Sequence, residues 1–133
     1  MSFSFSLRTS KKEELVDLTG KIQELVTKSG LKNGLVVIYV PHTTCGVTIN
    51  ENADPDVQFD LLMALKKAIP DTLPYSHLEG NSPAHVKASL VGSSQIVLVE
   101  EGRLKLGTWQ GIFLCEFDGP RLRQVWVKIL AEG

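Results

Sequence analysis

The chain has 133 residues, of which 43% are hydrophobic and 22% are charged, a composition typical of one soluble globular domain with its own core. Its 14 basic and 15 acidic residues give a net charge of −1, which gives no support for non-specific binding to nucleic acid. No apolar run approaches the roughly 20 residues of a membrane span, and the first residues lack the pattern of a signal peptide. Cys45 and Cys115 have neither zinc-site spacing nor the density of a disulfide scaffold, so we expect a cytoplasmic protein with reduced thiols.

The first 30 residues predict a strand and then a helix. Residues 2–8 alternate between apolar and polar side chains, which is typical of a half-buried strand. Ser10 and Glu13 have the spacing of a capping box, and apolar residues follow at helical spacing as far as Gly30. We therefore expect an amphipathic helix that begins after Ser10 and ends at Gly30.

The next segment predicts two strands and a second helix. The β-branched run 35–40 indicates a buried strand, and residues 47–49 indicate another short strand after the polar loop 42–46. Asp54 followed by Pro55 is a helix-start signal, so we expect a helix from there to the proline at position 70.

Residues 77–90 hold two of the three histidines together with a carboxylate, an amide, a hydroxyl and a lysine. Ser82 followed by Pro83 predicts a helix start, with Ser82 as the capping residue. His85 then falls in the first turn, where free N–H groups and the helix dipole favour an anion, and Lys87 adds positive charge. The alternative is a polar loop that caps a short surface helix.

The last third of the chain predicts β structure, with strands at 95–100, 103–106, 111–117 and 123–130. The element order β-α-β-β-α-(α)-β-β-β-β predicts an α+β fold with an antiparallel or mixed sheet, two main helices and a short third helix. We expect one compact domain over residues 1–133.

All three histidines, His42, His77 and His85, lie in polar loops or at a helix start. Three neutral imidazoles with a carboxylate from Glu51, Asp54 or Glu79 would suit a zinc-like ion. Their spacings match no local zinc motif, so the fold or a subunit interface would have to assemble the site. The alternative is hydrogen-bonded histidines that cap loops.

Three further groups are candidates for chemistry. Helix capping explains Asp54, but nothing local explains Glu51, which makes Glu51 the better general base or ligand. Trp109 and Gln110 lie between two glycines. The glycines would allow a ligand to approach the backbone closely, and Trp109 would then stack on it. The alternative is a β-bulge with a packed tryptophan. Arg121 and Arg123 can clamp a phosphate or carboxylate, or else are solvated turn residues.

Cys45 follows His42 by three residues, and one interpretation of this pair is a Cys–His nucleophile. A small cysteine beside Gly46 at the entrance to a strand is as often a packing residue. Cys115 lies in a strand that is expected to be buried, and we expect it to be inert.

Four motifs together closely resemble the YjbQ-like family, a group of small uncharacterised proteins. They are His42-Thr43-Thr44 with residues 46–56, His77 with residues 79–85, residues 106–111, and residues 116–121. The match runs through nearly the whole chain in order and without gaps. The resemblance implies a compact α+β domain with a β-sandwich-like core, assembled as a homotrimer. It also implies the weak activity for which some members are described as secondary thiamine-phosphate synthases.

The resemblance also implies a set of site residues. It places four of them in the pocket, namely His42, His77, Asn81 and His85, and five as neighbours, namely Glu51, Asp54, Trp109, Gln110 and Arg121. Relatives often carry alanine or another small residue at the Cys45 position, which argues against Cys45 as an essential nucleophile.

We therefore expect a small homotrimeric enzyme that acts on a phosphorylated metabolite, with sites at or near the subunit interfaces. The expected catalytic residues are His42, Glu51, His77 and His85. The expected substrate-binding residues are Asn81, Ser82, Lys87, Trp109, Gln110 and Arg121. In the thiamine reaction, Arg121, Lys87 and the helix start at Ser82 would surround the leaving diphosphate. Trp109 would stack on the rings.

Two other functions fit the same residues. The first is a metal-dependent hydrolase, in which His42, His77 and His85 hold a zinc-like or magnesium ion and Glu51 acts as the base. The second is a non-catalytic trimer that binds a metabolite or a metal.

Overall fold

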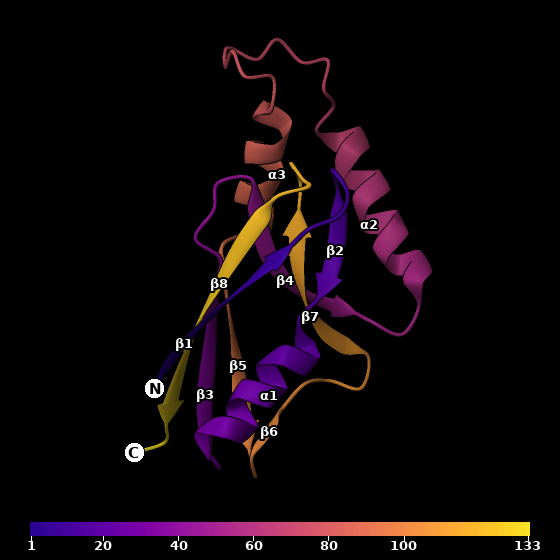
Figure 1. Cartoon of the computed structure of the whole chain (residues 1–133). Coiled ribbons are helices and arrows are strands. Elements are labelled where there is room, and N and C mark those ends of the chain that lie inside the picture. The colour runs from indigo at the N-terminus through magenta and orange to yellow at the C-terminus, as the bar shows by residue number, and fades with distance from the viewer.

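A computed structural model describes all residues, 1–133, as two antiparallel β-sheets and three helices (Figure 1). The larger sheet has the order β1 (Ser2–Arg8), β8 (Leu122–Ala131), β3 (Gly34–Tyr39), β5 (Ser94–Glu100) and β6 (Arg103–Leu104). The smaller sheet has the order β2 (Glu14–Asp17), β7 (Gln110–Glu116) and β4 (Cys45–Glu51). The helices are α1 (Thr19–Ser29), α2 (Pro55–Ala68) and α3 (Ser82–Val91). The predicted α+β fold is confirmed.

The main core of 16 buried residues lies between the two sheets and takes in α1. From α1 it receives Ile22, Leu25 and Val26, which fall on one helical face. The alternation along β8 supplies Val125, Val127 and Ile129 from the larger sheet. Burial of these side chains is the main force that holds the two sheets together.

A second, smaller core covers the other face of the small sheet. Cys115 and Phe117 pack there against Ala84 and Ala88 of α3. Two leucines of α2 pack against the same cluster, although no residue of α2 is fully buried. The molecule is therefore layered in the order α2 and α3, small sheet, main core, large sheet. No helix of the structure is long and apolar enough to cross a membrane.

The start of α1 differs from the prediction. The structure begins the helix at Thr19, because residues 14–17 form β2 and pair with β7 from Glu14 opposite Glu116 to Asp17 opposite Phe113. The predicted capping box is wrong: the carboxylate of Glu14, not Glu13, accepts the hydrogen bond from the Ser10 backbone N–H. Pairing with a central strand has overridden the helical spacing of the first apolar residues.

The predicted capping residue is right for α2 and wrong for α3. Asp54 caps α2 as predicted, since its Oδ1 accepts from the Asp56 N–H at 2.9 Å and Pro55 is the first helical residue. The predicted cap of α3 is wrong by one position: Asn81 precedes the helix and Ser82 is already inside it. No side chain caps α3: Asn81 Nδ2 donates to Asp118, and Asn81 Oδ1, the atom that could accept from a helix N–H, has no partner.

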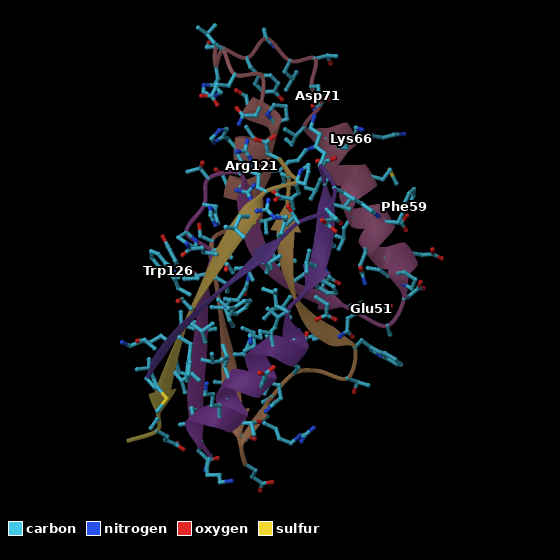
Figure 2. All side chains as sticks on the ribbon, in the orientation of Figure 1. Glu51, Phe59, Lys66, Asp71, Arg121 and Trp126 are labelled. Atoms are coloured by element: carbon cyan, nitrogen blue, oxygen red, sulfur yellow. The ribbon has the colours of Figure 1, made fainter.

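The outward face of the large sheet carries exposed apolar side chains. Tyr39 stacks on Trp126 with ring centroids 5.8 Å apart, and Trp126 points away from the body of the molecule (Figure 2). Ile96, Leu98 and Leu130 lie on the same sheet with 62%, 53% and 44% of their surface exposed. We call these five residues the apolar face. A patch of this kind is typical of a surface that another protein covers.

Candidate functional site

An open polar pocket of about 340 Å³ lies where the loop after β3, the turn before β8 and the start of α3 meet. We call it the histidine pocket. It brings together His42, Asn81, His85 and Arg121, which were predicted site residues. The rest of its lining comes from Pro41, Thr43, Thr44, Glu79 and Arg123, so proline is the one side chain that is neither polar nor charged.

His42 is held by the edge of the large sheet. Its Nε2 accepts a hydrogen bond of 2.8 Å from the backbone N–H of Gln124, which places the ring proton of the neutral imidazole on Nδ1. Burial, and then the positive charge of Arg123, lower the pKa of His42 below its ordinary value. His42 is therefore a neutral donor through Nδ1, with its Nε2 lone pair already engaged.

A buried ion pair supports the floor of the pocket. Glu116 is 0% exposed and Arg123 is 4% exposed. Arg123 donates to the Glu116 carboxylate through Nε at 2.8 Å and through Nη2, and Thr9 donates to the same carboxylate at 2.7 Å. The Arg123 Nη2 also donates to the Thr44 hydroxyl at 2.9 Å, which fixes the loop that carries His42.

A second set of hydrogen-bonded side chains forms one wall of the histidine pocket. Asp118 Oδ2 accepts from Arg121 Nη2 at 2.9 Å and from Asn81 Nδ2 at 3.0 Å. Burial alone would raise the pKa of Asp118, but the hydrogen bonds from Asn81 and Arg121 outweigh it and hold the pKa below its usual value. Asn81 Oδ1 is the one buried side-chain polar atom without a hydrogen-bond partner. Arg121 is thus fixed by its carboxylate partner rather than free in solvent.

The hydrogen bonds of both arginines use Nε and Nη2. The Nη1 groups of Arg121 and Arg123 consequently have no partner in the chain. An anchored guanidinium with a free edge is suited to hold an anion in a defined orientation. The start of α3 adds one free backbone N–H, that of Ser82, because Pro83 has none and the N–H groups of Ala84 and His85 donate to the Asn81 carbonyl.

His77 lies next to the pocket but does not line it. Its ring meets the ring of His85 edge to face, with centroids 5.5 Å apart, and its Nε2 lies 3.7 Å from Glu79 Oε2. No three of the His, Cys, Asp and Glu side chains come close enough within one chain to hold a metal ion. Metal binding by the histidines stays a prediction.

Glu51, Trp109 and Gln110 lie far from the pocket within one chain. Glu51 is the last residue of β4, where it pairs with Gln110, and Cys45 is the first. At the usual rise per residue the two ends of the strand are about 20 Å apart. In Figure 2 Arg121 is labelled in the upper part of the molecule and Glu51 well below it, near mid-height. Trp109 is 63% exposed, and the Gln110 side chain accepts from the backbone N–H of Gly107. These residues can meet a histidine pocket only across a subunit interface.

Both cysteines are inert in the fold. Cys45 and Cys115 are each 1% exposed, and burial raises the pKa of each thiol to about 12. The thiolate that a cysteine nucleophile requires is therefore scarce at neutral pH.

Sequence reasoning missed Glu116, Thr44 and Thr9 as parts of the site. One signal was present for Glu116, a carboxylate inside the otherwise apolar strand run 111–117. Such a charge is almost never buried without a partner. Nothing local marked Thr9, whose contact with Glu116 spans 107 positions.

The comparisons with known proteins agree with this architecture. A family model described as UPF0047 protein YjbQ-like matches residues 3–132. The chain belongs to the YjbQ-like family. The UPF0047 protein MJ1081 of Methanocaldococcus jannaschii is 53% identical over 132 residues, which cover 99% of this chain and 96% of that protein. The UPF0047 protein YugU of Bacillus subtilis is 48% identical over 128 residues, 96% of this chain and 97% of YugU.

Solved structures of the YjbQ-like family have the same fold. An uncharacterised conserved protein from Clostridium acetobutylicum superposes with a TM-score of 0.94 at 54% identity, over 96% of this chain and 99% of that one. A protein of unknown function from Sulfolobus solfataricus gives a TM-score of 0.94 at 36% identity, over 99% and 97% of the two chains. These relatives establish the family and its fold.

Proposed function

We propose that this YjbQ-like protein binds a phosphorylated small metabolite in the histidine pocket and acts on it as an enzyme. The observation that carries the proposal is the pair of anchored arginines, Arg121 and Arg123, each with a free Nη1 at one polar pocket. His42 and His85 add imidazole N–H donors, and the Ser82 N–H at the start of α3 has no partner. Phosphate binding at helix starts and by arginine edges follows from these features.

The reaction that fits the family resemblance is displacement of diphosphate, as in thiamine-phosphate synthesis. The nitrogen of a thiazole phosphate would attack the methylene carbon of a pyrimidine diphosphate, and the carbon–oxygen bond to diphosphate would break. Arg121 and the start of α3 would stabilise the charge on the leaving group. In one chain Trp109 lies too far away to stack on the rings, so that role requires a neighbouring subunit.

We propose that the assembly is a homotrimer and that other copies of the chain cover the apolar face. Tyr39, Trp126 and the three aliphatic residues beside them are exposed, as expected of a surface buried by association. The substitution Trp126→Glu should place a charge in that interface and reduce the molar mass measured by light scattering to that of one subunit. Lys28→Glu, at an exposed position of α1 on the other side of the large sheet, is the matched control.

A metal-dependent hydrolase is the second candidate: His77 contacts His85 and lies 3.7 Å from Glu79, and because these residues do not form a metal site within one chain, a further ligand would have to come from another subunit. A zinc-like ion or magnesium would activate water there, with a base such as Glu51 supplied by another subunit. Elemental mass spectrometry decides this candidate. If wild-type protein holds close to one ion per subunit and both His77→Ala and His85→Ala lose it, the metal-dependent hydrolase becomes the leading candidate in place of diphosphate displacement. A trimer that binds ligand without turnover is the third candidate.

The direct test is calorimetric titration with inorganic diphosphate, followed by an assay of diphosphate release from the thiamine precursors. Arg121→Ala and His85→Ala should each weaken binding at least about tenfold while the protein stays folded by circular dichroism, in keeping with about 1.5–3 kcal/mol for a charged hydrogen bond. Lys105→Ala is the control, because Lys105 pairs with Glu100 on the surface at the far end of β5. Unchanged binding in both pocket variants would contradict the proposal.

A further inference from the structure

The histidine pocket has no apolar lining apart from Pro41. Its other lining side chains are those of histidine, threonine, glutamate, asparagine and arginine. Both tryptophans of the chain lie outside it: Trp109 precedes β7 at the end that pairs with Glu51, and Trp126 belongs to the apolar face. Within one chain the pocket is therefore suited to a ligand portion that is polar throughout, because an apolar ring or chain would find little surface to pack against.

Burial fixes one of the donors of this pocket. Arg123 is 4% exposed, and its Nε and Nη2 donate to Glu116 and Thr44. Its Nη1 has no partner in the chain, yet the one buried side-chain polar atom without a partner is Asn81 Oδ1. The Nη1 group therefore keeps its small exposure at the pocket that Arg123 lines. A guanidinium anchored in this way holds one oxygen of an oxyanion at a fixed position.

Glu79 has the opposite requirement. Its carboxylate lines the same pocket, and its side chain is 75% exposed. Its Oε2 lies 3.7 Å from His77 Nε2, and no lysine or arginine pairs with it. An ionised carboxylate only accepts hydrogen bonds, so Glu79 repels a phosphate and attracts the O–H or N–H donors of a ligand.

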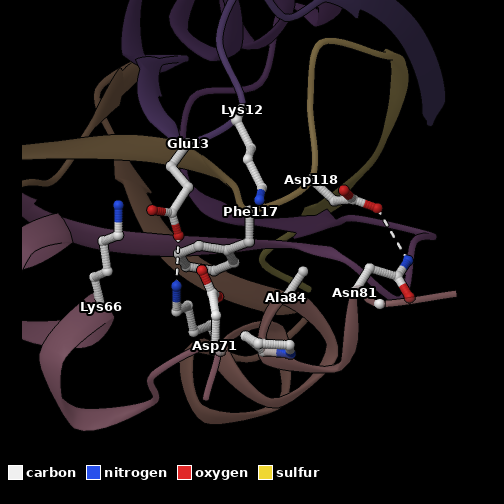
Figure 3. Close-up of a pocket in the computed structure, with 11 residues that line it drawn as sticks. Lys12, Glu13, Lys66, Asp71, Asn81, Ala84, Phe117 and Asp118 are labelled. Carbon is white, nitrogen blue, oxygen red and sulfur yellow. Dashed lines mark hydrogen bonds and ion pairs between the residues drawn. The ribbon is translucent and has the colours of Figure 1, made fainter. Parts of the chain in front are cut away.

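Two further side chains of the pocket have unused acceptors. Asn81 donates to Asp118, which turns Asn81 Oδ1 away from that carboxylate and leaves it without a donor (Figure 3). Thr43 is exposed and its hydroxyl makes no hydrogen bond within the chain, whereas the Thr44 hydroxyl accepts from Arg123. A ligand hydroxyl can donate to a carboxylate or amide oxygen and can also pair with a threonine hydroxyl. The pocket is therefore matched to donor groups beside a phosphate, and not to a second anion.

We propose that the ligand of the histidine pocket is a hydroxylated phosphate ester, that is, a sugar phosphate or a polyol phosphate. Its phosphate meets the open Nη1 groups of Arg121 and Arg123. Its hydroxyl groups donate to Glu79 and pair with Thr43. This inference rests on the proposed phosphate site and narrows its substrate class, favouring hydroxylated substrates over the heteroaromatic precursors of thiamine.

The test compares phosphate esters that differ only in their hydroxyl groups. Glycerol phosphate is titrated calorimetrically against propyl phosphate, and sorbitol phosphate against hexyl phosphate. Wild-type protein should bind at least one polyol phosphate about tenfold more tightly than its alkyl match, as expected of a hydrogen bond to a charged group. Glu79→Ala and Thr43→Val should each reduce that preference severalfold. Alkyl phosphate should bind Glu79→Ala no more weakly than wild type, because the repulsion by Glu79 is removed.

The matched control is Glu24→Ala, which removes an exposed carboxylate of α1, at the other end of the molecule from α3 in Figure 1, and should change neither affinity. Equal affinity for polyol and alkyl phosphates would overturn the hydroxyl assignment and leave the phosphate site standing. A preference that persists unchanged in both pocket variants would overturn it too, because the hydroxyl groups would then bind elsewhere.

Two further outcomes separate this inference from the alternatives. Aminoethyl phosphate and hydroxyethyl phosphate differ only in the donor group, so tighter binding of aminoethyl phosphate would mean that Glu79 selects an ammonium group and that the hydroxyl assignment is wrong. If no phosphate ester binds, the proposed function fails together with this inference.

Discussion

Removing one charge of the Glu116–Arg123 pair should strongly destabilise the fold. Glu116→Leu leaves the Arg123 guanidinium buried without its counter-charge and removes the shorter of the two hydrogen bonds that the Thr9 hydroxyl can donate. Breaking half of a buried pair typically costs about 3–5 kcal/mol. Because total domain stabilities are about 5–15 kcal/mol, this one substitution should remove a large share of the free energy of unfolding.

The double variant Glu116→Leu/Arg123→Met separates the charge effect from simple loss of contacts. Matched apolar residues often replace a buried pair at little cost, so most of the stability should return. Phosphate affinity should not return, because the Thr44 hydroxyl loses its donor and the pocket loses one guanidinium. Urea unfolding at fixed subunit concentration, followed by tryptophan fluorescence, measures the first effect. A cost below about 1 kcal/mol for Glu116→Leu, no more than an average substitution, would refute the reasoning.

Three further predictions follow from burial and packing. Cys45 and Cys115, with pKa values of about 12, should resist alkylation near neutral pH until urea is added; rapid labelling of the native protein would contradict their burial. The folded-state pKa of His42 is lowered from 6.5, so its contribution to stability is full above that pH and declines as the pH falls below it; in unfolding curves, His42→Gln should lose less stability than wild type on acidification. Gly46→Ala would place a Cβ 2.6 Å from a backbone oxygen at the end of α3 and should cost about 1–3 kcal/mol in the same assay. The control Gly20→Ala, with open space around it in α1, should gain up to about 1 kcal/mol, and equal effects would refute the packing argument.

The strands and the second helix could be predicted because their signals are local. Alternation marks β1, the β-branched run marks β3, and the Asp54-Pro55 pair marks the start of α2. The start of α1 could not be predicted in the same way. Leu15 and Val16 fit a helical stripe and a strand equally well, and pairing with β7, which is distant in sequence, decides between the two.

The residues of the candidate site also differ in whether local sequence marks them or distant partners decide their role. Polar segments around His42, His85 and Arg121 are locally conspicuous, and the fold brings them to one pocket. Glu51 is equally conspicuous, but it lies at the far end of β4, and the sequence does not show which end of a strand faces which loop. The burial and anchoring of Arg123 could not be predicted without knowing its partner, Glu116, which lies in the other sheet.

Strand β8 connects the proposed pocket to the proposed interface. Arg123 points inward to Glu116. The next residue, Gln124, donates its backbone N–H to His42, and its side-chain oxygen accepts from the Trp126 indole N–H at 3.4 Å. Three residues within four positions of one strand, Arg123, Gln124 and Trp126, therefore serve the buried pair, the imidazole and the apolar face. A subunit that packs on Trp126 would therefore contact β8 two residues away from Gln124, the residue that binds His42. Association of subunits and binding of ligand are consequently expected to stabilise each other, because both restrict the same length of β8.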